Sequence, residues 1–136
     1  MSNSEAQIFE SIPSNISAFE VLNLIRQHSI NSSHLRLVKK VSDLSDEKLS
    51  ASLNLNVKTF RTYKNSKSTK LKADLQEHTI VLLSLIKHGI EVFGSKENFN
   101  KWLEHDNFHL GMRKPIEYLN TISGIKFIDN RITGIE

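Results

Sequence analysis

The sequence contains no cysteine, two prolines, five glycines and no long apolar run in its 136 residues. Without cysteine the chain has neither disulfides nor a thiolate metal site. Its longest apolar run, residues 80–86, is far shorter than the roughly 20 residues that a membrane-spanning helix needs. Glu5 and Glu10 stand where a secretory signal would be basic and then apolar. We therefore expect a cytoplasmic protein without a membrane segment, built from one or two small domains.

Recognisable catalytic patterns are also missing. The sequence has no glycine-rich phosphate loop, and Ser95, Ser123 and His88 form no recognisable setting for a nucleophile. His105 and His109 stand four residues apart, a spacing that suits a metal site on a helix, but no third ligand accompanies them. The sequence predicts no enzyme, no cofactor and no metal site.

Acidic residues are absent from one window of the chain. Residues 58–72 hold six basic residues and no acid, although the net charge of the whole chain is only +3. A charge concentrated in this way favours a polyanionic partner, and nucleic acid is the commonest. A solvated lysine face is the alternative that charge alone leaves open.

Helical patterns begin after a short polar segment. Residues 1–16 are rich in Ser and Asn and contain Pro13, a composition that predicts a flexible tail. Ser17 and Glu20 form a capping box, which predicts a helix over about residues 18–28. A second helix is expected to follow a cap at Asn31 or Ser32.

Two short helices joined by a turn coincide with the basic window. Ser45 can cap the first helix, Asn54 can end it in the left-handed conformation, and Asn56 can cap a second helix over residues 57–65. This pattern is typical of a helix-turn-helix, whose second helix enters the major groove of DNA. The predicted DNA-binding residues lie on and just after this second helix: Lys58, Thr59, Arg61, Thr62, Lys64, Asn65 and Lys67.

These residues differ in the contacts that they can make with DNA. Arg61 can offer two parallel donors to guanine, and Asn65 can read adenine. Lys64 and Lys67 are better suited to phosphates, which fix position without specifying sequence.

The carboxyl half contains one long apolar helix and several shorter segments. The helix expected over residues 74–93 is apolar around so much of its circumference that it should pack against both halves of the chain or a second protomer. Residues 122–132 fit either a helix or a strand. No other strand pattern occurs. We therefore predict an all-α chain, with a helix-turn-helix domain over residues 17–73, a second helical domain over residues 74–136, and a homodimer.

The carboxyl half also resembles a known domain family. The stretch from Val92 to Glu136 is similar to the toxin-binding domain of Xre/ParS-type antitoxins that are paired with RES-domain toxins. The amino half resembles the family's Xre-like helix-turn-helix. The matching motifs are V-F-G at Val92-Phe93-Gly94, W-L at Trp102-Leu103, L-G at Leu110-Gly111, P-x-x-L-L at Pro115 with Tyr118-Leu119, T-x-x-G at Thr121 with Gly124, and I-E at Ile135-Glu136.

The resemblance implies the antitoxin of a type II toxin-antitoxin system. Such a protein binds its RES-domain toxin, blocks the toxin's NAD-consuming active site and represses its own operon by binding operator DNA. The resemblance also implies that the toxin contacts lie at the carboxyl end, at Arg131, Thr133, Gly134, Ile135 and Glu136. The alternative is a free-standing dimeric helix-turn-helix transcriptional regulator, which a neighbouring gene without a RES-like product would favour.

Overall fold

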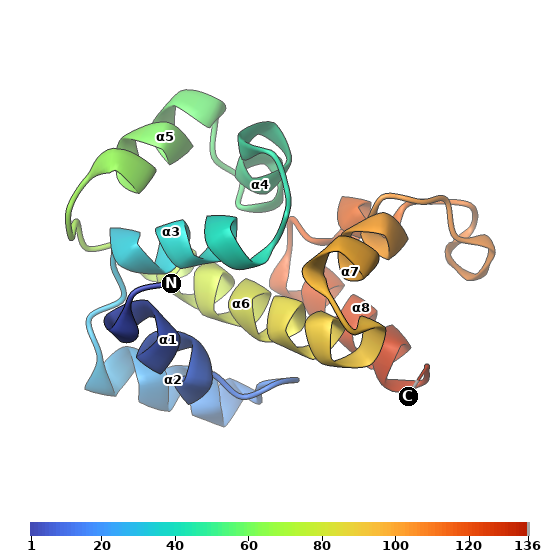
Figure 1. Ribbon diagram of the computed structural model, residues 1–136, viewed down its shortest axis with the longest axis horizontal. Helices are drawn as coiled ribbons and strands as arrows, with labels where there is room; N and C mark the ends of the chain where they lie inside the picture. The colour runs from blue at the N-terminus through green and yellow to red at the C-terminus, as the bar shows by residue number, and fades with distance from the viewer. Residues whose placement is uncertain (136) are drawn as a thin grey trace.

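A computed structural model describes residues 1–135, and over that range the chain is helical with no strand (Figure 1). The prediction of an all-α fold is confirmed, and residues 122–132 are helical. Two 3-10 helices, η1 (Phe108–Leu110) and η2 (Pro115–Tyr118), precede the last helix. The α-helices are α1 (Asn3–Ser11), α2 (Ala18–Gln27), α3 (Ser32–Val41), α4 (Asp46–Ser52), α5 (Val57–Asn65), α6 (Ala73–Phe93), α7 (Lys96–Leu103) and α8 (Ile122–Thr133).

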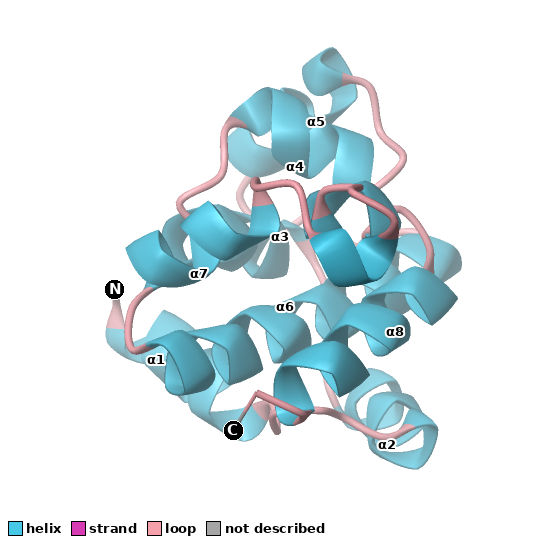
Figure 2. Cartoon of the chain, turned by 90° about the vertical axis from the view of Figure 1, so that its right-hand side faces the viewer, coloured by secondary structure: helices cyan, strands magenta, loops and turns pink. Residues whose placement is uncertain are grey.

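Helix α6 runs through the middle of the molecule (Figures 1 and 2). Thirteen of its 21 residues are buried, because α2 and α3 pack against it from the amino half and α7 and α8 from the carboxyl half. The expectation that this helix packs against both halves is confirmed. The apolar surface of α6 is therefore covered by helices of the same chain. The predicted homodimer stays a prediction.

The first sixteen residues are ordered. Helix α1 begins with a capping box in which the Ser2 hydroxyl accepts a hydrogen bond from the backbone N–H of Glu5, at 3.2 Å. Ile12 and Ile16 are fully buried in the core. The prediction of a flexible tail over residues 1–16 is wrong, because residues 3–11 form a helix and the apolar side chains of Ile12 and Ile16 are buried in the core.

The turn between α4 and α5 has the backbone geometry that the sequence indicates. Asn54 has a φ of 58°, in the left-handed region that ends helices, and the Asn56 side chain accepts a hydrogen bond from the N–H of Thr59 at 2.7 Å. Phe60 is fully buried, so α5 turns one face to the core and the other to solvent. Residues 53–56 connect the two short helices near the top of the molecule in Figure 1, where the Asn54 side chain donates to the carbonyl oxygen of Asn120 at 2.7 Å.

Candidate partner-binding surfaces

The outer face of α5 carries three of the residues predicted to bind DNA. Lys58, Thr62 and Asn65 are exposed, and their spacing of four and three residues puts them on one side of the helix. Thr62 is engaged locally, since its hydroxyl donates to the carbonyl oxygen of Lys58 at 3.0 Å. Thr59 is half-buried and lies beside this face.

Two further predicted DNA contacts, Arg61 and Lys64, are held by acidic residues of α4. Arg61 Nε donates to Oδ2 of Asp46 at 3.1 Å, and its Nη2 donates to Oε1 of Glu47 at the same distance. Lys64 Nζ donates to the same Asp46 oxygen at 2.8 Å, and Lys39 Nζ lies 3.2 Å from the other. The hydrogen bond from Lys64, followed by those from Arg61 and Lys39, holds the pKa of Asp46 well below its usual range.

This arrangement changes the electrostatics that the sequence indicated. Residues 58–72 contain no acid of their own, yet Asp46 and Glu47 neutralise part of the window in space. Within residues 1–135, the ion pairs of this window involve Arg61 and Lys64. Positive charge is therefore displayed mainly by the exposed lysines at positions 58, 67, 70 and 72.

The segment after α5 is fixed to α3. Nη2 of Arg36 donates to the carbonyl oxygen of Lys67 at 2.8 Å, and Nη1 donates to that of Ser66. The N–H of Ser32 donates to the carbonyl oxygen of Thr69 at 2.9 Å. These bonds order the backbone of Lys67 while its side chain stays exposed.

The predicted toxin contacts gather at the end of α8. Arg131, Thr133, Gly134 and Ile135 are all exposed, and Ile135 exposes 53% of its surface. Glu136, the fifth predicted contact, lies outside the described residues. The opposite side of α8 is buried through Ile125, Ile128 and Ile132. The helix is thus packed against the core while its carboxyl end is exposed to solvent.

Polar contacts inside the carboxyl half fix α8 and η2 on α6. Nδ1 of His88 lies 2.5 Å from Oδ1 of Asp129, and both side chains are buried. Nε2 of His78 lies 2.9 Å from the carbonyl oxygen of Leu119, which follows η2. Three widely separated segments are thereby held in one arrangement.

The histidine pair considered as metal ligands is divided between two elements. Nδ1 of His105 lies 2.6 Å from the carbonyl oxygen of Lys101 at the end of α7, whereas His109 belongs to η1. Among residues 1–135 no group of three or more His, Cys, Asp or Glu side chains is placed to hold a metal ion.

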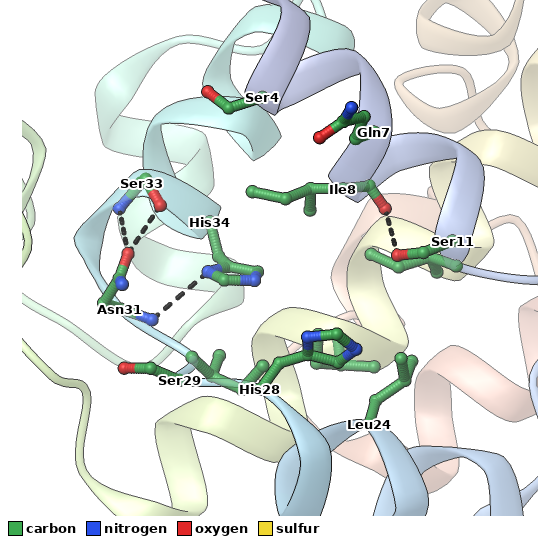
Figure 3. A pocket seen from close by; sticks show the side chains of 13 residues that line it. Ser4, Gln7, Ile8, Ser11, Leu24, His28, Ser29, Asn31, Ser33 and His34 are labelled. Carbon is green, nitrogen blue, oxygen red and sulfur yellow. Dashed lines mark hydrogen bonds between the residues drawn. The ribbon is translucent and has the colours of Figure 1, made fainter.

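A cavity of about 350 Å³ lies between α1, the segment linking α2 to α3, and α3 itself (Figure 3). Ile8 and Leu24 line its sides, and His34 turns its ring toward it while its Nδ1 accepts from the N–H of Asn31 at 3.2 Å. Burial lowers the pKa of His34, so the ring is neutral at pH 7. Neither an acid nor a lysine or arginine lines this cavity, which gives it no counter-charge for an ionic ligand.

Two exposed apolar side chains were not identified from the sequence as candidate contacts. Phe108 and Met112 lie in the loop between α7 and η2, and expose 81% and 57% of their surfaces. The available signal was a pair of large apolar residues within the otherwise polar stretch HDNFHLGM.

Comparison with known proteins bears on the carboxyl half. In the described range, no helix has both the length and the apolar composition needed to cross a membrane. No curated protein matches the chain. The family model of the antitoxin Xre/MbcA/ParS C-terminal toxin-binding domain matches residues 88–136. The segment that begins in the last turns of α6 and continues through α8 is thus similar to an antitoxin's toxin-binding domain.

Proposed function

We propose that the protein is the antitoxin of a type II toxin-antitoxin system and inhibits a RES-domain toxin that consumes NAD. The observation that carries the proposal is the match of residues 88–136 to an antitoxin toxin-binding domain. The choice of a RES-domain toxin rests on the motif resemblance, from Val92-Phe93-Gly94 to Thr121 with Gly124.

The carboxyl end supplies a means of inhibition. Arg131, Thr133, Gly134 and Ile135 stand beyond the buried side of α8, so they can enter a cleft of a partner without unfolding of the helix. Arg131 offers a bidentate donor to carboxylates or phosphates, and Ile135 offers exposed apolar surface. Glu136 would extend the same contact.

Reconstitution with the protein encoded by the neighbouring gene tests this proposal. We expect the two purified proteins to form a stable complex in which NAD consumption by the partner is suppressed. A chain shortened after Ile132 should bind more weakly and inhibit less, whereas Lys101→Ala, an exposed change on α7, should leave both unchanged. A neighbour that consumes NAD but neither binds nor is inhibited would refute the proposal.

We also propose that α5 binds operator DNA and thereby represses the operon. Support comes from the short helix-turn-helix arrangement of α4 and α5, whose outer face displays Lys58, Thr62 and Asn65. The exposed lysines that follow can neutralise phosphates. To contact a base or phosphate, Arg61 would have to break its ion pairs with Asp46 and Glu47. The loss of these ion pairs lowers the net free energy that Arg61 contributes to DNA binding.

A mobility-shift titration with the DNA upstream of the gene tests this second proposal at several salt concentrations. Asn65→Ala should cost about 1–3 kcal/mol and relax sequence preference if Asn65 reads a base. Arg61→Ala should have an effect of the same size if Arg61 is a reader. Lys67→Ala should weaken binding to all sequences and lower the salt slope by about one. Unaltered slopes and affinities, or no binding at low salt, would exclude this use of α5.

The alternative function is a free-standing dimeric transcriptional regulator. It shares the DNA-binding proposal but needs no toxin. Specific DNA binding by a dimer, together with a neighbouring gene that encodes no NAD-consuming protein, would favour it.

A further inference from the structure

Large exposed apolar side chains are unevenly distributed along the described chain. Three of them, Met1, Phe19 and Leu22, lie near the amino end. The other four lie within the segment that matches the toxin-binding domain: Phe108, Met112, Phe127 and Ile135. Exposed apolar groups of this size are typical of protein interfaces when they occur together.

We infer that Phe108 and Met112 form a second toxin-docking point, which inserts into an apolar depression on the toxin beside the site that receives the carboxyl end. This inference rests on the proposed toxin binding and adds to it a contact that the carboxyl end does not supply. Phe108 is the most exposed large apolar side chain in the described chain, and Met112 lies four residues after it in the same loop.

The loop that carries the two side chains is held in one shape. The N–H of Asn107 donates to the carbonyl oxygen of Arg113 at 3.0 Å, and that of Met112 donates to the carbonyl oxygen of Asn107 at 2.9 Å. The Asn107 side chain caps η1 by accepting from the N–H of His109 at 2.9 Å, and Leu110 anchors the loop in the core. A preformed loop loses little conformational freedom on binding, which favours affinity.

Met112 has a backbone conformation and an exposure that do not favour the stability of the fold. Its φ is 65°, in the left-handed region, where a methionine side chain is disfavoured and asparagine or glycine is tolerated. The methionine is also 57% exposed, so its side chain buries little apolar surface and contributes little to stability. An apolar side chain that packs with little else and sits on an unfavourable backbone is explained by contact with a partner.

The position of the loop fits a partner that also receives the carboxyl end. The loop and the carboxyl terminus lie on the same side of the molecule, which faces the viewer in Figure 2. The face of α5 proposed for DNA lies at the other end (Figure 1). A toxin seated on the loop and the end of α8 would therefore leave α5 accessible.

A second copy of this chain fits the loop less well. Because the loop projects from the right-hand side of the molecule in Figure 1, a second copy would have to receive it in a hollow such as the cavity beside α1. That cavity lies against α1 and α3, outside the segment that matches the toxin-binding domain. We therefore assign the loop to the toxin, because Phe108 and Met112 lie within the segment that matches a toxin-binding domain.

Binding of the full-length protein to its toxin, measured by calorimetry or surface kinetics, tests the inference. We expect Phe108→Ser to weaken binding by about 10- to 100-fold, as for a central aromatic contact, chiefly through faster dissociation. Met112→Asn should also weaken binding and should fold at least as well, because asparagine tolerates the left-handed backbone. The matched control is Phe19→Ser, an aromatic residue that is 72% exposed on α2, outside the matched segment.

The outcomes separate the inference from the proposal beneath it. If the unmodified protein binds and inhibits the toxin while Phe108→Ser and Met112→Asn bind within twofold of it, the loop is not a docking point and the proposed function stands. If Phe19→Ser weakens binding as much as Phe108→Ser, the effect is not specific and the inference fails. A change in the mass of the antitoxin alone in Phe108→Ser would assign the loop to self-association. If the unmodified protein binds no toxin, the proposed function fails, and the inference fails with it.

Discussion

Replacement of Gly124 by alanine should strongly destabilise the protein, because α8 passes η2 at this residue with no room for a side chain. A Cβ at Gly124 would lie 1.8 Å from the carbonyl oxygen of Tyr118 and 2.9 Å from Oγ1 of Thr121. Real Cβ atoms essentially never approach other heavy atoms within 3.0 Å, so α8 and the end of η2 would have to separate by about 1.2 Å. Since the clashing atom belongs to the backbone, no rotamer change can relieve it.

The size of the effect follows from what this separation would disturb. Overpacking typically costs about 1–3 kcal/mol. The shift would also disturb the bond between His78 and the carbonyl oxygen of Leu119, and loss of a buried partner costs a further 1–3 kcal/mol or so. We expect Gly124→Ala to lower the free energy of unfolding by about 2–6 kcal/mol in all, and Tm by about 7–20 °C for a chain of this length.

Urea and thermal unfolding, followed by circular dichroism and by the fluorescence of Trp102, measure this loss. Gly134→Ala is the matched control, because its Cβ would come no closer than 3.4 Å to another heavy atom and its φ of −70° suits alanine. The control should lie within about 0.5 kcal/mol of the unmodified protein. If Gly124→Ala is equally harmless, α8 and η2 do not pack as closely as described.

Two further substitutions test polar contacts that join distant parts of the chain. Asp46→Asn should cost about 1–2 kcal/mol at pH 7; because the pKa of Asp46 is lowered in the folded state, the deficit should be full above about pH 4 and shrink as the pH falls below it. Urea titrations of both proteins at pH 7 and pH 2 measure this, and an equal deficit at both would contradict it. Ser84→Ala removes the hydroxyl that accepts from the N–H of Ile16 at 2.9 Å and donates to the carbonyl oxygen of Pro13 at 2.7 Å, and should cost about 2–4 kcal/mol in unfolding experiments. A cost below about 0.5 kcal/mol would show that water replaces both bonds.

Helix boundaries were predictable from the sequence where they depend on neighbouring residues. The capping box of Ser17 and Glu20, the cap at Asn56 and the left-handed helix end at Asn54 all appear in the structure. A capping side chain bonds to backbone groups two or three residues away, so a cap can be recognised from a few consecutive residues of the sequence.

The order of the first sixteen residues could not be predicted in this way. Ile16 is held by Ser84, and the carbonyl oxygens of Phe9 and Ile12 accept from Nζ of Lys87 at 3.0 and 2.9 Å. These partners lie about 70 residues further along the chain. Composition describes the segment as polar, whereas its order comes from contacts that only the folded chain provides.

The same reasoning applies to the predicted DNA-binding residues. The sequence was enough to predict which of them share a helix face, but not which of them form ion pairs. The spacing of Lys58, Thr62 and Asn65 puts them on one helix face, because helical period is a local property. The ion pairs of Arg61 with Asp46 and Glu47 join residues 14 and 15 positions apart through the packing of two helices. A count of charges along the sequence cannot include them.

The two proposed surfaces share one hydrophobic core, although they lie at opposite ends of the molecule. The core cluster is continuous from Ile12 to Ile132, and α6 contributes its buried residues to both halves. A cut near residue 73 would leave each piece with about 60 residues and would expose the side of α6 that the other piece covers, so neither piece is expected to be stable alone. The division at residues 73 and 74 therefore stays a prediction about function, and the chain should unfold in a single transition. Two separate transitions in the unmodified protein would contradict this argument.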